Sequence, residues 1–280
     1  MNKIAVLSGK GGSGKTFIST NLANVIENST YLDCDVEEPN GYIFFNKDNS
    51  ALESKKVYRE IPTFDGDKCI GCRECVEFCK FSALAFIADK PLLFEEICHS
   101  CGGCELVCKH GAITNKKIEV GSLSVYKDKS IKTVSGQMRI GEASAVSLIS
   151  EVLKEATETT IVDCPPGSAC STMEAIKGAN YCILVTEPTI FSLHNIKMIV
   201  ELVELFKIPY GFVINKSDDQ LDYIIEDYIK SINKDLLMKV PFSKQIASIT
   251  SIGKLVSDED LESKQLFETL KQDLIKRAVL

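Results

Sequence analysis

The stretch "SGKGGSGKT" at positions 8–16 constrains the fold of this 280-residue chain more than any other. It contains a complete phosphate-binding loop, Gly9-x-x-x-x-Gly14-Lys15-Thr16, between an apolar segment at 3–8 and a segment at 15–27 with apolar residues at helical spacing. In such a loop the backbone N–H groups and the lysine hold phosphates, and the threonine hydroxyl binds Mg²⁺. The stretch therefore predicts a strand, a nucleotide-binding loop and a helix in that order.

The rest of the chain alternates between strand-like and helix-like segments. The strand-like segments are 30–35, 159–167, 181–188 and 210–215, and the helix-like segments are 147–156, 192–206 and the end of the chain from about 258. This alternation predicts an α/β fold with a mostly parallel sheet and helices on both of its faces.

Short segments with many Gly and Cys residues replace this alternation between about 62 and 120. We therefore expect an inserted domain at 62–120, which divides the main domain into an N-terminal part at 1–61 and a C-terminal part at 121–280.

Composition excludes several classes of protein. The net charge is −7 without a basic block, which argues against nucleic acid or an anionic membrane as a partner. No apolar run is long enough for a signal peptide or a membrane span, so we expect a cytoplasmic protein without a stable membrane anchor. An apolar stripe near the C-terminus has mixed charges beside it, which favours docking on the protein's own sheet over membrane binding. The stripe consists of Leu266, Phe267, Leu270, Leu274 and Ile275.

Eight of the twelve cysteines form two runs with one spacing, C-x₂-C-x₂-C-x₃-C. The first run is Cys69, Cys72, Cys75 and Cys79, and the second is Cys98, Cys101, Cys104 and Cys108. Disulfides are rare in reducing compartments, so metal ligation or redox chemistry is the better interpretation. The spacing of three cysteines by two residues suits the corners of an iron–sulfur cubane better than zinc. Cys34, Cys164 and Cys182 lie in or beside strands, where we expect them to pack.

An acid and a second lysine complete the candidate nucleotide site. Asp163 ends an apolar strand in "DCPPG", where its carboxylate can hold Mg²⁺ through water together with Thr16. Lys10 follows the first glycine of the loop, which an ordinary phosphate-binding loop does not require.

"KGGSGKT" with this extra lysine, "DCD" at 33–35 and "DCPPG" at 163–167 resemble the MinD/ParA group of P-loop ATPases, which includes the nitrogenase iron protein and the Mrp-type cluster carriers. The resemblance implies that Gly9, Lys10, Gly11, Gly12, Ser13, Gly14, Lys15 and Thr16 bind ATP. It implies an ATP-dependent dimer, either homodimer or heterodimer, in which Lys10 reaches the partner's phosphates. Lys10, Lys15 and Asp35 are then the catalytic candidates, with Asp35 orienting the attacking water. Asp33 helps to hold the Mg²⁺ shell, and Asn215 reads adenine.

The double cysteine run resembles bacterial-type two-cluster ferredoxins, in which the fourth cysteine of each run binds the other cluster. The resemblance implies one 4Fe-4S cluster on Cys69, Cys72, Cys75 and Cys108, and a second on Cys98, Cys101, Cys104 and Cys79. Lys80 and Lys109 stand where the ferredoxin pattern has proline, which should perturb the potentials without removing ligation.

The whole chain resembles MinD-superfamily ATPases with an inserted ferredoxin domain. Asp35 lies in the segment that senses γ-phosphate, and the insertion follows this segment. A change of bound nucleotide could therefore alter the position or exposure of the clusters. The leading hypothesis is ATP-gated electron transfer to a redox partner protein. The alternatives are a metallocofactor assembly or carrier ATPase and a positioning ATPase that senses redox state. Cys170, seven residues after Asp163, is either a semi-buried thiol or a cluster ligand at a dimer interface.

Overall fold

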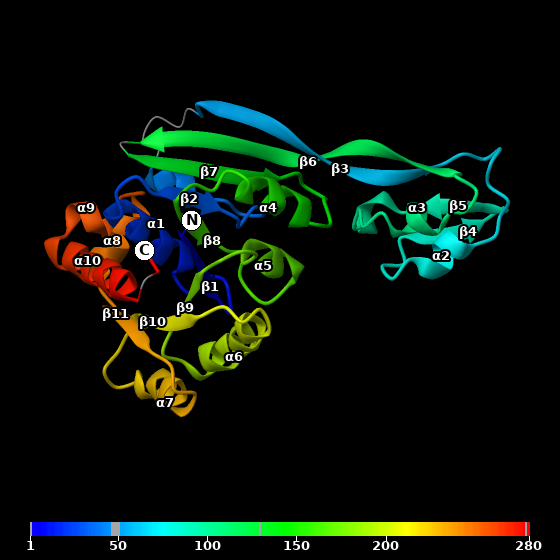
Figure 1. Cartoon of the computed structure of the whole chain (residues 1–280). Coiled ribbons are helices and arrows are strands. Elements are labelled where there is room, and N and C mark those ends of the chain that lie inside the picture. Colours follow the sequence, from blue (N-terminus) through cyan, green and yellow to red (C-terminus); the bar gives the residue numbers. More distant parts are fainter. Residues whose placement is uncertain (1, 46–50, 129, 278) are drawn as a thin grey trace.

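A nine-stranded sheet forms the body of the molecule, in the order β11-β10-β9-β1-β8-β2-β7-β6-β3 (Figure 1). The structure is a computed structural model that describes residues 2–45, 51–128, 130–277 and 279–280. The strands of this sheet are β1 (Asn2–Ser8), β2 (Thr30–Asp33), β3 (Glu53–Phe64), β6 (Ile113–Asp128), β7 (Ile131–Met138), β8 (Thr159–Asp163), β9 (Tyr181–Thr186), β10 (Tyr210–Ser217) and β11 (Leu236–Pro241). Neighbours from β11 to β7 are parallel, whereas β7–β6 and β6–β3 are antiparallel. The predicted α/β fold with a mostly parallel sheet is confirmed.

Helices cover both faces of this sheet. They are α1 (Lys15–Val25), α4 (Val146–Leu153), α5 (Cys170–Ala175), α6 (Ile190–Leu205), α7 (Tyr223–Ser231), α8 (Lys244–Ser251), α9 (Val256–Glu259) and α10 (Leu261–Lys276), with a 3-10 turn, η1 (Gly41–Phe44). Strand residues alternate between the two faces. Thus Ile4 and Val6 of β1 pack in the core with α1 and α10, whereas Ala5 and Leu7 pack in the core with α4 and α6.

The C-terminal stripe docks on the body as its sequence predicts. Phe267, Leu270 and Leu274 of α10 are buried in the core shared with α1, and the Phe267 ring lies 5.8 Å from the ring of Phe17. Ile275 lies outside this core and is 43% exposed. Among the residues that the structure describes, no helix combines the length and apolarity that a membrane crossing requires.

A long antiparallel ribbon, β3 paired with β6, extends beyond the body and carries a small lobe at its far end (Figure 1). The lobe, residues 65–112, holds α2 (Glu74–Phe78), β4 (Leu84–Ile87), β5 (Lys90–Leu93), η2 (Glu95–Ile97) and α3 (Gly103–Val107). We call it the cysteine lobe. It falls within the range expected for the inserted domain, although the ribbon itself belongs to the large sheet. Residues 36–40 and then η1 follow Asp35 in the chain, and the ribbon separates the lobe from this segment.

The cysteine lobe has little apolar core. One small cluster of buried side chains, Ile61, Ala83 and Cys98, lies where the lobe meets the ribbon. Many large apolar side chains of the lobe are exposed, including Ile70, Phe81 and Leu106. A unit this small rarely stabilises itself by apolar burial alone and usually needs crosslinks or metal.

Candidate nucleotide site and cysteine pockets

The phosphate-binding loop connects the end of β1 to the start of α1, as predicted. Gly14 precedes the helix with φ 90°, and a Cβ there would lie 2.0 Å from Asn215 Nδ2. Both the positive φ and the close approach require glycine at this position. The loop therefore presents its backbone N–H groups at the N-terminus of α1, where anions bind readily.

Lys15 lies at the centre of a buried group of acids. Its Nζ is 2.9 Å from Asp163 Oδ1 and 3.4 Å from Asp35 Oδ2. Burial alone would lower the pKa of Lys15, but the carboxylates of Asp163 and Asp35 raise it above its ordinary value. The hydroxyl of buried Tyr31 donates to Asp163 Oδ2 at 2.9 Å. Lys15 and Asp163 are thus held in place before any nucleotide binds.

Asp33 and Asp35 differ in what their carboxylates contact. Asp33 is 1% exposed, and its oxygens accept the backbone N–H groups of Gly41 at 2.9 Å and Asp35 at 3.2 Å. Burial raises the pKa of Asp33. It also raises the pKa of Asp35, which is less completely buried. In this structure Asp33 shapes the turn after β2, while Asp35 borders the open cavity.

A polar cavity of about 660 Å³ lies over the loop, as expected for a nucleotide site. The residues around it are Ser8, Lys10, Gly11, Gly12, Gly14, Lys15, Thr16, Asp35, Glu37, Glu38, Asn40, Pro165, Pro166, Ala169 and Ser171. The structure therefore brings the glycine loop, the segment after β2 and the segment after β8 together around one space. Gly9 packs against Asn195, and the Ser13 hydroxyl donates to the Lys10 carbonyl within the loop.

Lys10 points to Glu187 of its own subunit. Its Nζ is 2.8 Å from Glu187 Oε2, and Lys216 Nζ is 2.6 Å from Glu187 Oε1. Burial acts to raise the pKa of Glu187, but the two lysines outweigh it and lower the pKa. Sequence reasoning missed Glu187, because nothing in "VTEPT" marks its carboxylate as a partner of the distant loop.

Asn215 lies beneath the loop. Its Nδ2 donates to the Ser13 carbonyl at 2.9 Å, and the residue is 7% exposed. The structure thus shows a contact with the loop, and the reading of adenine by Asn215 stays a prediction.

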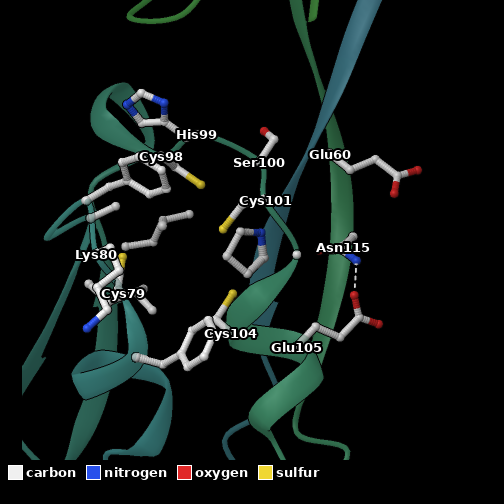
Figure 2. A pocket seen from close by; sticks show the side chains of 17 residues that line it. Glu60, Cys79, Lys80, Cys98, His99, Ser100, Cys101, Cys104, Glu105 and Asn115 are labelled. Atoms are coloured by element: carbon white, nitrogen blue, oxygen red, sulfur yellow. Dashed lines mark hydrogen bonds between the residues drawn. The ribbon is translucent and has the colours of Figure 1, made fainter. Parts of the chain in front are cut away.

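Eight cysteines of the cysteine lobe surround two separate pockets. The pocket that we call inner, of about 230 Å³, is lined by Cys79, Cys98, Cys101 and Cys104 (Figure 2). The outer pocket, of about 20 Å³, is lined by Cys69, Cys72, Cys75 and Cys108. Each set contains three cysteines of one run and the fourth of the other. The inner pocket borders Glu60 and Asn115 of the ribbon, whereas the outer pocket borders Phe64 and Ile113 at the ribbon's tip.

The thiols of both sets are free, and Figure 2 shows the four sulfur atoms of the inner set facing the same space. Burial raises the pKa of the Cys104 thiol to about 11. No three His, Cys, Asp or Glu side chains in the described ranges stand close enough to hold one metal ion. Four thiols spread around a pocket are a donor set that fits a cubane, because each thiol binds a different iron.

The remaining cysteines lie outside these pockets. Cys34, Cys164 and Cys182 are fully buried in the core, as expected for packing residues. Cys170 begins α5 and is exposed.

Comparison with known proteins identifies the family. The CobQ/CobB/MinD/ParA nucleotide binding domain matches residues 4–256. The chain belongs to this family. Two uncharacterized proteins of Methanocaldococcus jannaschii, MJ0579 and MJ0578, are each 31% identical to it; the alignments cover 90% of both chains for MJ0579 and 96% of both for MJ0578.

Solved MinD proteins share the fold of this member of the CobQ/CobB/MinD/ParA family. The MinD cell division protein of Aquifex aeolicus superposes with a TM-score of 0.60 at 16% identity, covering 99% of this chain and 98% of that one. MinD of Pyrococcus horikoshii, which was solved with Mg-ADP, gives a TM-score of 0.62 at 18% identity, covering 99% and 97%. The family assignment agrees with the predicted resemblance at the nucleotide site.

Tyr31 is a further residue of this family member's site that sequence reasoning missed. It lies two residues before Asp33, so both side chains face the same side of β2. That alternation was the available signal, because it places the Tyr31 hydroxyl on the face where Asp163 ends the neighbouring strand.

Proposed function

We propose that this protein is a dimeric ATP-binding and ATP-hydrolysing switch that carries two 4Fe-4S clusters and delivers electrons to a redox partner protein when ATP is bound. One observation carries the proposal. The two four-cysteine pockets combine the runs in the crossed pattern of two-cluster ferredoxins, and they lie on a lobe held by the same sheet as the phosphate-binding loop.

The nucleotide half of the proposal rests on the cavity over the loop. The N–H groups before α1 and the ammonium of Lys15 bind the phosphates. Thr16 and Asp163 would hold Mg²⁺, which neutralises phosphate charge when it is bound. With Mg²⁺ bound, the Asp163 carboxylate would face the metal shell in place of Lys15, and the Lys15 ammonium would be available to the phosphates. Asp35, at the cavity wall, is placed to orient an attacking water.

The cluster half rests on the chemistry and stability of the cysteine lobe. Four free thiols around each pocket would ligate a cubane, which supplies a site for one electron. The lobe buries few apolar side chains, so two clusters would also provide the crosslinks that hold it together. The exposed thiols of Cys72 and Cys101 leave the clusters near the surface, where a partner can exchange electrons with them.

Analysis of anaerobically purified protein tests the cluster half. We expect about eight irons and eight sulfides per chain and, after reduction with dithionite, an EPR spectrum of two interacting cubanes. Zinc in place of iron would overturn the proposal. Transfer of iron to an apoprotein at the rate of ATP turnover would favour the carrier function instead.

Two lysine variants test the nucleotide half. Lys15→Ala should weaken ATP binding itself, because it removes charge from the subunit's own phosphates. Lys10→Ala should leave ATP binding nearly unchanged but abolish ATP-dependent dimerisation and hydrolysis, since its charge acts on the partner's phosphates. Light scattering that shows an undiminished ATP-dependent dimer of Lys10→Ala would reject the action across the dimer.

A further inference from the structure

A buried arginine stands where the ribbon leaves the body. Arg59 of β3 forms an ion pair with Glu142, which lies in the turn between β7 and α4; Arg59 Nε is 2.9 Å from Glu142 Oε1, although the angle of this contact is not that of a hydrogen bond. The two side chains are only 2% and 1% exposed. Charges this deeply buried are screened by salt much less than exposed charges are.

The other side of the Arg59 guanidinium holds the inner pocket. Its Nη1 donates to the Cys98 carbonyl at 2.8 Å and to Ser100 Oγ at 3.0 Å, and its Nη2 donates to the Glu95 carbonyl at 2.9 Å. Cys98 lies two residues before Ser100 and Cys101 directly after it, and both cysteines line the inner pocket. The rigid fork of donors therefore fixes the position of the loop that bears these two cysteines.

The Glu142 side of the pair leads to the nucleotide site. Glu142 N donates to the Arg139 carbonyl at 3.1 Å. Met138, the residue before Arg139, donates its N–H to the Val36 carbonyl at 2.8 Å. Val36 directly follows Asp35 at the cavity wall. An unbroken series of contacts thus runs from Asp35 through β7 and Glu142 to Arg59 and Cys98.

We infer that Arg59 is a positioning residue for the inner cluster, and that the Arg59–Glu142 pair transmits the nucleotide state from the Asp35 segment to that cluster. This inference rests on the proposed function. A buried cation beside Cys98 stabilises the cluster after it takes one electron from a low-potential donor, and so raises its reduction potential. The cation beside the outer pocket, Arg73, is exposed and lies over the Phe86 ring, so solvent screens it.

EPR-monitored redox titration of the holoprotein, with MgADP and with a non-hydrolysable MgATP analogue, tests the inference. The inner signal is the one that Cys101→Ser removes. Arg59→Met should lower the ratio of reduced to oxidised inner cluster about tenfold at a fixed potential, equivalent to ~59 mV, and leave the outer cluster unchanged. Arg59→Lys should recover the potential, because it restores the charge, but not the difference between nucleotides, because it lacks the fork.

Two further variants complete the design. Glu142→Gln should raise the inner potential and also remove the difference between nucleotides. Lys116→Met is the matched control: Lys116 pairs with the side chain of Glu95 at 2.6 Å, but it is 49% exposed, so its removal should change neither property.

Hydrogen exchange of residues 95–104 gives a readout that does not depend on electron transfer. In wild type, the exchange rates of these residues should differ between MgADP and the analogue. In Glu142→Gln, the two rates should be equal. Unchanged inner potential in Arg59→Met together with a wild-type nucleotide difference in Glu142→Gln would overturn the inference while leaving the proposed function intact. Absence of clusters from the wild-type protein would instead reject the proposed function itself. Should Arg59→Met fail to fold, Arg59→Lys and Glu142→Gln decide the matter.

Discussion

Lys10 and Glu187 form an ion pair within one subunit, with Lys10 Nζ 2.8 Å from Glu187 Oε2. The lysine proposed to act on a partner's phosphates is therefore held in its own subunit before the dimer forms. Glu187 also binds Lys216, whose Nζ lies 3.3 Å from the Gly12 carbonyl of the loop. In the proposed dimer, phosphate would have to replace the Glu187 carboxylate as the partner of Lys10, so Glu187 would compete with the nucleotide.

Glu187→Gln should promote the ATP-dependent dimer. The variant keeps the size of the side chain but removes the charge that holds Lys10 and repels phosphate. Lys10 is 37% exposed, so solvent screens the pair, and we expect only a change of about 2- to 5-fold in the ATP concentration for half-maximal dimerisation. Light scattering against ATP concentration measures it.

Glu174→Gln is the matched control for this prediction. The side chain of Glu174 is 11% exposed, compared with 12% for Glu187, and it also pairs with a lysine, Lys177, but away from the cavity. A midpoint that stays at the wild-type value in Glu187→Gln would show that the pair does not compete with the nucleotide.

Exchanging the fourth cysteine of each run should damage the opposite cluster. Cys108 lines the outer pocket and Cys79 the inner one, so Cys108→Ser should lose the outer EPR signal and Cys79→Ser the inner signal. Each variant should retain about half of the iron. Iron analysis and EPR of both variants measure the effect, and each serves as the control for the other. The reverse assignment of signals would contradict the crossed ligation.

Sequence reasoning succeeded where chemistry is local in the chain. Gly14 and Lys15 lie within one motif, and Asp163 ends an apolar strand, so the contact of Asp163 with Lys15 beneath the cavity followed from the known behaviour of parallel strands. The two sets of cysteines could likewise be assigned from their spacing and the ferredoxin resemblance.

The residues that were missed depend on contacts between distant segments. Strands β3 and β6 have mixed, charged sequences that do not alternate clearly, because the ribbon leaves the body and much of it faces solvent. The two strands pair where the chain enters and leaves the cysteine lobe. Arg59 was missed for the same reason. A single arginine in "KKVYRE" has the pattern of a surface charge, and only the folded chain encloses it between the turn after β7 and the cysteine lobe.

Asp222 should make stability depend on pH in the acid range. Burial acts to raise the pKa of Asp222, but hydrogen bonds from Ser217 Oγ at 2.6 Å and Asp218 N at 3.0 Å, with the ion pair to Lys239 at 2.9 Å, lower it. A carboxyl whose folded pKa is lowered contributes stability above its unfolded pKa, about 3.9, and loses that contribution as the pH falls through the folded value.

Asp222→Asn should therefore reduce the free energy of unfolding by about 1 kcal/mol at pH 7, because it removes the charge that pairs with Lys239, while Lys239 is 37% exposed and keeps Glu226 as a partner. The difference from wild type should persist down to about pH 4 and shrink below it. Urea denaturation of both proteins across this range measures it, with the exposed Asp219→Asn as control. An equal loss at pH 7 and pH 3 would assign the effect to packing instead of charge.

The last prediction concerns the first contact in the series from nucleotide to cluster. Asp35 borders the cavity, and its neighbour Val36 accepts the N–H of Met138. If bound Mg²⁺ and γ-phosphate drew Asp35 toward them, the end of β7 would have to follow or this hydrogen bond would break. Asp35→Ala should therefore reduce the difference in inner-cluster potential between MgATP and MgADP, while the potential with MgADP stays close to wild type.

The size of this coupling follows from linkage. Allosteric couplings are typically about 1–3 kcal/mol, and about 1.4 kcal/mol corresponds to ~59 mV for one electron, so we expect tens of millivolts in wild type and much less in the variant. By reciprocity, reduction must change ATP affinity by the same factor, roughly tenfold at 1.4 kcal/mol. EPR titration with each nucleotide, paired with ATP binding to oxidised and reduced protein, measures both sides. Glu27→Ala, which removes an exposed acid away from the cavity, should behave as wild type. Equal potentials and equal affinities in every state of the wild-type protein would exclude thermodynamic gating and leave ATP-controlled docking to the partner as the means of directing electrons.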